Sequence, residues 1–145
     1  METITSEQWQ QLAQLAEKAR SKAYAPYSGY LVGCAALYLD ENRITQVTHG
    51  ANIENASYGL TMCAERVALS TALMNGAKRF IAVAIATQGP MPASPCGACR
   101  QFLAEFSESL PVALVVGGEI KELTDNSILL PKSFASKFLN KSRLY

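Results

Sequence analysis

Three cysteines in two separate segments place the strongest constraint on how this chain can fold. Residues 61–66 read TMCAER, and residues 94–99 read SPCGAC. Cys96 and Cys99 have the C-x-x-C spacing with which two thiolates reach one ion from the first turn of a helix. Cys63 can supply a third thiolate only if the fold brings the two segments together. The pattern therefore predicts two helix starts that meet at one metal site.

A site with three protein ligands leaves the fourth position of a tetrahedral zinc ion open. Structural zinc sites are usually closed by four protein ligands, whereas catalytic sites keep three and a water molecule. Glu65 follows Cys63 by two residues and is the natural partner for that water. Three ligands, a glutamate that is not a ligand and a P-C-x-x-C element form the pattern described for zinc deaminases of nucleobases. We therefore predict one Zn²⁺ per subunit held by Cys63, Cys96 and Cys99, with Glu65 as the catalytic residue.

Other interpretations of these cysteines are ordinary core packing or a thioredoxin-like disulfide, because C-x-x-C near a β-α pattern is also a redox motif. Pro95 and the second motif at Cys63 favour zinc. Cys34 lies in an apolar run without a partner at ligand spacing, so we expect it in the core. His49 is the only histidine and falls outside both motifs, so we predict a structural or exposed position.

Composition and charge limit the class of protein. A length of 145 residues and 49% hydrophobic residues suit one domain, residues 1–145, with a substantial core. The 13 basic residues balance 12 acidic ones without a basic cluster, which predicts a small-molecule substrate and no nucleic-acid partner. We expect no membrane span and no signal peptide. Reduced thiols, which zinc ligation requires, predict a cytoplasmic protein.

The order of apolar and polar segments predicts an α/β fold. Strands separated by helices favour a three-layer α/β/α architecture, with a mixed five-stranded sheet and helices on both faces. Thr5 and Gln8 form a predicted capping box for the first helix, which should end before Pro26. The expected strands are 31–39, 44–49, 80–86, 112–116 and 120–123, and the other expected helices are 63–75, one from about Cys96, and a short one through Phe134 and Phe138.

The predicted metal segments also make electrostatic sense. Three thiolates on one Zn²⁺ carry a net charge of −1, and two helix N-termini directed at the site offset part of it. Arg66 lies in the first turn of the helix after Cys63 and is positioned to donate to a ligand sulfur. A second polar segment holds Asn52 and Glu54, two residues apart. In an extended loop, an amide and a carboxylate so spaced point the same way and suit the hydroxyls of a ribose.

These motifs together resemble those of the small, homotetrameric cytidine deaminases. The segment 52–58 (NIENASY), combined with a Cys-Ala-Glu helix start, is much more specific for this family than the zinc motif, which the wider deaminase superfamily shares. The three-cysteine ligand set resembles the tetrameric branch. The resemblance covers nearly the whole chain and is carried by 24–28 (YAPYS), 32–33 (VG), 52–58 (NIENASY), 63–66 (CAER), 95–101 (PCGACRQ), 129–131 (LLP) and Phe134.

The resemblance implies hydrolytic deamination of cytidine and 2′-deoxycytidine to uridine and 2′-deoxyuridine, with release of ammonia, in pyrimidine salvage. It implies a cytidine deaminase-like fold and a homotetramer with composite active sites. Asn52 and Glu54 would hold the ribose 3′-hydroxyl. By similarity, Ala56 and Tyr58 come from a neighbouring subunit to the 5′ end, and Phe134 of another subunit packs on the pyrimidine. Tyr30 packs against the base, and Ala64 is a further substrate contact.

Tyr30 departs from the resemblance, because the family usually has phenylalanine at this position against the base. Tyrosine keeps the ring and adds a hydroxyl that needs a partner if it is buried. The change leaves open a shifted preference, such as for a modified nucleoside. Two further alternatives are a structural zinc module without catalysis and a deaminase of another aminopyrimidine or of a nucleotide.

Overall fold

A five-stranded mixed sheet organises the computed structural model, which describes residues 3–139. The strand order is β2-β1-β3-β4-β5. Only β3 and β4 pair in parallel, and the other neighbours pair antiparallel. The predicted mixed five-stranded sheet is confirmed. The strands are β1 (Gly33–Asp40), β2 (Thr45–Ala51), β3 (Ala77–Thr87), β4 (Pro111–Val116) and β5 (Glu119–Asp125).

One face of the sheet is covered by helix α1 (Ser6–Arg20). The predicted capping box is present: the Thr5 hydroxyl accepts from the Gln8 amide at 3.1 Å, and the Thr5 amide donates to the Gln8 side chain at 2.9 Å. The helix approaches β1 closely at Gly33, where an added Cβ would lie 2.0 Å from the Ala16 carbonyl oxygen. Glycine is therefore needed at this crossing. The buried face of α1 comprises Leu12, Ala13, Ala16 and Ala19.

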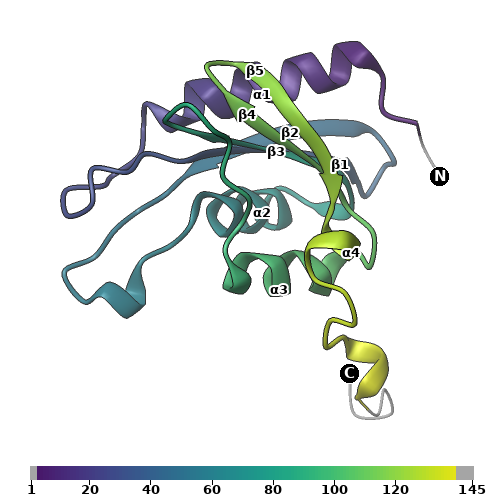
Figure 1. The fold of residues 1–145 in the computed structure, drawn as a ribbon. Helices are drawn as coiled ribbons and strands as arrows, with labels where there is room; N and C mark the ends of the chain where they lie inside the picture. Colours follow the sequence, from purple (N-terminus) through teal and green to yellow (C-terminus); the bar gives the residue numbers. More distant parts are fainter. Residues whose placement is uncertain (1–2, 140–145) are drawn as a thin grey trace.

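Helices α2 (Ala64–Met74) and α3 (Gly97–Phe106) cover the opposite face (Figure 1). Their buried residues Leu69 and Leu103 belong to one apolar cluster with Ile85 of β3. Strand β2 meets α2 at Gly50, where an added Cβ would lie 2.6 Å from the Ala68 backbone nitrogen. Helices on both faces confirm the predicted three-layer arrangement.

The topology brings the starts of α2 and α3 to the same end of the sheet. Strands β2 and β3 both run antiparallel to β1, so their carboxyl ends lie at the same end of the sheet. Helix α2 follows the end of β2 through a loop that contains a 3₁₀ turn (Tyr58–Leu60), and α3 follows the end of β3. In open α/β sheets, ligands bind outside the carboxyl ends of strands. The loops at this end extend well beyond the sheet (Figure 1).

The C-terminal part differs from the sequence prediction. A four-residue helix, α4 (Asn126–Leu129), follows β5, and a 3₁₀ turn covers Ser136–Phe138. Phe134 lies outside both, so the predicted helix through Phe134 and Phe138 is wrong. Pro131 and the positive φ of 55° at Lys132 interrupt helical backbone before that point. No helix among residues 3–139 is long and apolar enough to cross a membrane.

Candidate functional site

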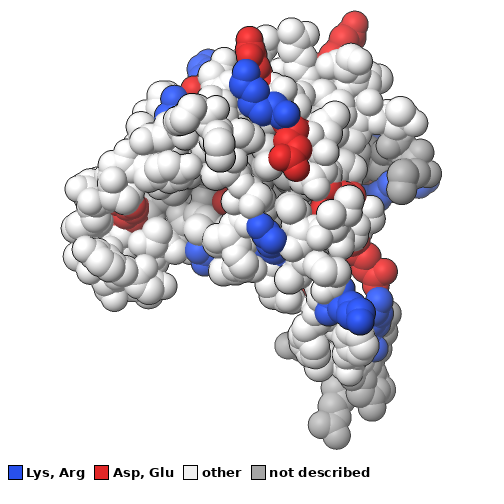
Figure 2. Space-filling model, viewed as in Figure 1, with Lys and Arg blue, Asp and Glu red and all other residues white. Residues whose placement is uncertain are grey.

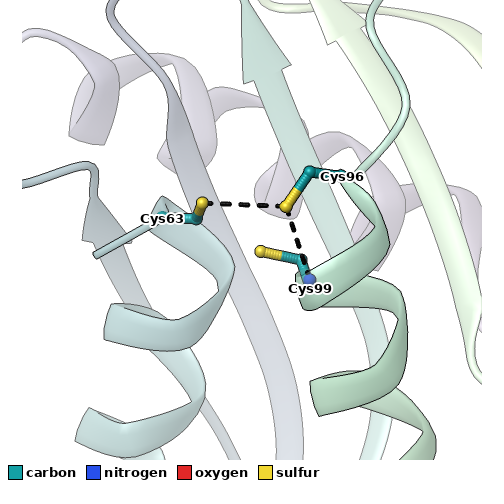
Figure 3. A group of neighbouring side chains, drawn as sticks. All are labelled: Cys63, Cys96 and Cys99. Atoms are coloured by element: carbon teal, nitrogen blue, oxygen red, sulfur yellow. Dashed lines mark hydrogen bonds between the residues drawn. The ribbon is translucent and has the colours of Figure 1, made fainter. Parts of the chain in front are cut away.

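The sulfur atoms of Cys63, Cys96 and Cys99 converge between the starts of α2 and α3 (Figure 3). Cys63 is the N-cap of α2, and Cys96 is the N-cap of α3. The three Sγ atoms all lie within 4.8 Å of one another, and those of Cys63 and Cys96 are 3.8 Å apart. Ligands at ~2.3 Å from a tetrahedral zinc lie roughly 3.8 Å apart, so the spacing fits this ion.

The chemistry of the three thiols also fits a divalent cation. The pKa of the Cys63 thiol is lowered to about 5 by hydrogen bonding with Cys99 and then by the Arg66 guanidinium. The pKa of Cys99 is raised by the hydrogen bond with Cys63 and by burial. Thiols packed this closely cannot all ionise without compensation, because like charges disfavour one another. A bound cation removes this obstacle.

The Glu65 carboxyl is buried beside these thiols. Glu65 lies in the first turn of α2 and is 4% exposed, and its Oε2 accepts from the Cys99 thiol at 3.4 Å. Burial raises the pKa of this carboxyl above its ordinary value. A carboxyl group with a raised pKa is suited to both accepting and donating protons near neutral pH. The structure thus brings the predicted catalytic residue to the predicted ligands.

Arg66 contacts the site from the same helical turn. Its Nη2 donates to the Cys63 sulfur at 3.2 Å and to the Thr61 carbonyl at 3.2 Å. This is the contact expected from the sequence. The Thr61 carbonyl fixes the guanidinium, so the positive charge stays beside the sulfur.

A cavity of about 340 Å³ opens onto the two helix starts. It contains two carboxylates, Glu54 and Glu65, and no lysine or arginine among residues 3–139 lines it. About half of its lining residues were not predicted as site residues, because they lie in loops or at the end of β3 and carry no motif of their own. The predicted residues that line it are Tyr30, Asn52, Glu54, Cys63, Ala64, Glu65 and Cys96, and the further lining residues are Ser28, Val32, Thr61, Ile85, Thr87, Ala93 and Ser94.

Asn52 holds one wall of this cavity in place. Its side-chain oxygen accepts from the Val32 amide at 2.8 Å, and its Nδ2 donates to the Tyr30 carbonyl at 2.8 Å. Asn52 is buried, so these bonds replace lost hydration. One N–H of its amide group remains for a ligand, because the group carries two donors. Asn52 therefore also sets the position of the Tyr30 backbone.

The Glu54 carboxylate is held by the loop that precedes Tyr30. It accepts from the Ser28 hydroxyl, from the Tyr27 amide at 3.0 Å and from the Ser28 amide at 3.1 Å. The Ser28 hydroxyl bond and these amide bonds lower the pKa of Glu54, so it is ionised at neutral pH. Ser28 belongs to the YAPYS segment that carries the family resemblance, but the sequence does not show that its hydroxyl binds Glu54.

Three predicted substrate contacts lie outside the main cavity. Ala56 is exposed on the loop that leads to α2. Tyr58 lines a neighbouring cavity of about 220 Å³, which shares Ser28, Glu54 and Thr61 with the main one. Phe134 is exposed, and its ring stacks with that of Phe138 at a centroid distance of 6.0 Å. Within one chain, these residues do not reach the thiols.

The two remaining sequence predictions on single residues can be placed. Cys34 is fully buried in the cluster beneath α2, as expected. Burial raises the pKa of its thiol well above the ordinary value, so it stays protonated. His49 is half-buried on β2 and lies apart from the three thiols, beside a small cavity that Lys22 and Val67 also line.

Comparison with known proteins agrees with this geometry. The family model described as "Cytidine and deoxycytidylate deaminase zinc-binding region" matches residues 6–114. The cytidine deaminase of Sporosarcina psychrophila is 44% identical over 126 residues, which cover 86% of this chain and 89% of that protein. The cytidine deaminase of Halalkalibacterium halodurans is 43% identical over 134 residues, which cover 90% and 97%.

A solved structure shows the same fold. The 1.6 Å crystal structure of cytidine deaminase from Burkholderia pseudomallei superimposes with a TM-score of 0.76 at 41% identity, and the match covers 90% of this chain and 99% of that one. The family match spans the strands and helices that carry the three thiols and Glu65. The chain belongs to the cytidine and deoxycytidylate deaminase family and is a zinc enzyme with one Zn²⁺ per subunit.

Proposed function

We propose that this protein deaminates cytidine and 2′-deoxycytidine by hydrolysis, giving uridine and 2′-deoxyuridine with release of ammonia. The observation that carries the proposal is a buried carboxyl, Glu65, placed against three converging thiols at the base of a cavity. The reaction recovers pyrimidine nucleosides, so we assign the enzyme to pyrimidine salvage. The similarity to named cytidine deaminases supports this assignment.

The residues divide the chemistry between them. Cys63, Cys96 and Cys99 hold zinc, which supplies a Lewis acid that makes water nucleophilic near neutral pH. Glu65 accepts the proton of the attacking water and delivers it to N3 of the pyrimidine as the C4–O bond forms. Glu65 then takes the remaining proton from the new C4 hydroxyl and passes it to the amino group, the C4–N bond breaks as the C4 carbonyl forms, and ammonia leaves. Because one carboxyl performs every transfer, its burial and its position matter more than a tuned pair of acids.

The other end of the cavity holds the sugar and the base. Asn52 has a remaining donor and Glu54 remaining acceptor capacity, so they bind the ribose 3′-hydroxyl. Tyr30 and Ala64 line the cavity and contact the pyrimidine.

A free nucleoside fits this cavity better than a nucleotide. A phosphate would require basic side chains near the 5′ end, and the cavity is lined by two carboxylates instead. On the face drawn in Figure 2, basic and acidic side chains are scattered among each other, whereas a polynucleotide requires a basic track. We therefore favour nucleosides over deoxycytidylate and RNA as substrates.

We further propose a homotetramer in the cytoplasm, with one domain per chain. Ala56, Tyr58 and Phe134 are exposed in one chain, so they are free to complete the site of another subunit. Tyr58 and Phe134 are large hydrophobic groups, which favours their burial in an assembly. The reduced thiols of the zinc site suit the cytoplasm.

The test combines metal analysis with an ultraviolet assay. Purified protein should contain one zinc per chain and should act on cytidine and deoxycytidine, but not on cytosine or cytidine monophosphate. A strong chelator should abolish turnover, and added Zn²⁺ should restore it. Activity on none of the nucleosides would contradict the proposal. Activity on the monophosphate alone would show that the substrate is a nucleotide and not a nucleoside. Light scattering of the same sample tests the tetramer.

A further inference from the structure

Arg100 follows directly after Cys99, and its guanidinium binds three acceptors at once. Nε donates to the Pro95 carbonyl at 2.8 Å, and Nη2 donates to the Ser94 hydroxyl at 2.8 Å. Nη1 donates to the Leu129 carbonyl at 2.7 Å. All three acceptors are uncharged, so the contacts depend on the directions of the planar donor fork rather than on an ion pair.

Two of these acceptors lie in the segment that leads into α3. Ser94 and Pro95 directly precede Cys96, whose Sγ is 3.8 Å from that of Cys63. Ser94 also lines the substrate cavity together with Ala93, whereas Arg100 does not line it. The backbone of Cys96 is therefore held from two sides, by the helix that follows it and by the Arg100 fork.

The third contact fastens this segment to the C-terminal part of the chain. Leu129 is the last residue of α4, and a carbonyl at a helix end lacks a partner within the helix. The contact is reinforced from the other direction, because Nδ2 of the buried Asn126 donates to the Arg100 carbonyl at 3.0 Å. Next to it, the Gln101 side chain donates to the Phe134 carbonyl at 2.8 Å. Three hydrogen bonds of Arg100 and Gln101 thus join the start of α3 to the segment 126–134.

We propose that Arg100 is a positioning residue, which fixes Ser94 and Pro95 so that Cys96 meets zinc and the cavity wall keeps its shape. The inference rests on the proposed function, since it concerns the same zinc site. Arg100 touches neither substrate nor metal and acts through the backbone before Cys96. Outer partners of metal ligands typically contribute about 10- to 100-fold to metal affinity.

The test compares Arg100→Gln and Arg100→Lys with Arg79→Gln as a control. Arg79 is exposed near the start of β3, at the other end of the strand from Thr87, and its replacement removes the same charge. Zinc affinity is measured by competition with a chromogenic chelator, and KM and kcat are measured for cytidine. Arg100→Gln should weaken zinc binding by about 10- to 100-fold and raise KM. Arg100→Lys should also be impaired, because lysine keeps the charge but not the fork.

Several outcomes would overturn the inference. Full zinc affinity and KM in Arg100→Gln, with only a lower melting temperature, would make Arg100 a stabilising residue alone. Full rescue by lysine would show that charge and not geometry acts. If Arg100→Gln does not fold, Ser94→Ala removes one acceptor of the same fork and should weaken zinc binding by about fivefold; unchanged affinity there refutes the link. A wild-type protein without zinc would instead refute the proposed function.

Discussion

The two ends of the substrate cavity are built in different ways. At the metal end, Cys63, Glu65 and Cys99 lie at the starts of two helices that pack on the sheet, and Glu65 and Cys99 are buried. At the ribose end, Glu54 and Tyr30 lie on loops that extend beyond the sheet, and Tyr30 is partly exposed. Helix starts packed on a core fix side chains more firmly than exposed loops do.

The difference indicates which part of the site one chain can complete. The metal end has its thiols, carboxyl and guanidinium in mutual contact within a single chain. The ribose end is held largely by hydrogen bonds between loops, such as those of Asn52 and Glu54. Exposed aromatic rings surround it, with Tyr27 and Tyr58 at a centroid distance of 5.8 Å. We therefore expect mutations at the metal end to act on zinc and kcat, and those at the ribose end to act on KM.

The largest effect is expected from Glu65→Gln. Glutamine keeps the shape of the side chain but cannot carry the proton, so kcat should fall by about 10²- to 10⁴-fold. Zinc content should stay at one per chain and KM should change little, because the thiols and the ribose end are intact. Stopped assays with metal analysis measure all three quantities. A kcat within tenfold of wild type would remove Glu65 from the proton transfers.

Arg66→Gln should have the next largest effect, still at the metal end. The change removes the donor to the Cys63 sulfur and leaves thiolate charge without compensation. Zinc affinity should fall by about 10- to 100-fold, and kcat should fall with it when zinc is limiting. Arg66→Lys keeps the charge without the planar set of donors, so its zinc affinity should lie between those of the wild type and Arg66→Gln. Wild-type zinc affinity in Arg66→Gln would show that the contact is not needed.

The metal end was largely predictable from the sequence because its residues lie within two short motifs. Spacing alone places Cys96 and Cys99 in one helical turn and Glu65 beside Cys63. The capping box at Thr5 and the apolar strand runs likewise depend on neighbours in the sequence, and the structure confirms them. Sequence motifs are therefore sufficient to predict a site whose residues lie close together in the chain.

The ribose end was only partly predictable, because distant loops meet there. Asn52 and Glu54 were selected as ribose contacts, but their partners at Val32 and Ser28 follow from the tertiary fold and leave no periodic signal. The same holds for Arg100, whose three acceptors include Leu129, far along the chain. Sequence patterns report which side chains are polar, but not which backbone groups they reach.

Glu54→Gln should act at the ribose end alone. Glutamine can keep one oxygen toward the Tyr27 and Ser28 amides, but the other carboxylate oxygen becomes an amide nitrogen, which cannot accept from the Ser28 hydroxyl or from the ribose. KM for cytidine should rise by about tenfold, whereas zinc affinity should stay unchanged. Glu122→Gln, on the exposed part of β5, is the matched control. A loss of zinc in Glu54→Gln would break the division between the two ends.

Tyr30→Phe should have the smallest effect. The ring lines the cavity, and among residues 3–139 its hydroxyl has no hydrogen-bond partner. Removing a hydroxyl without a partner should change the free energy of unfolding by less than about 0.5 kcal/mol and kcat/KM for cytidine by less than about threefold. Parallel assays on cytidine and deoxycytidine check this. A tenfold change for one nucleoside alone would show that the hydroxyl contacts the bound sugar or base, and would make Tyr30 the residue that sets substrate preference.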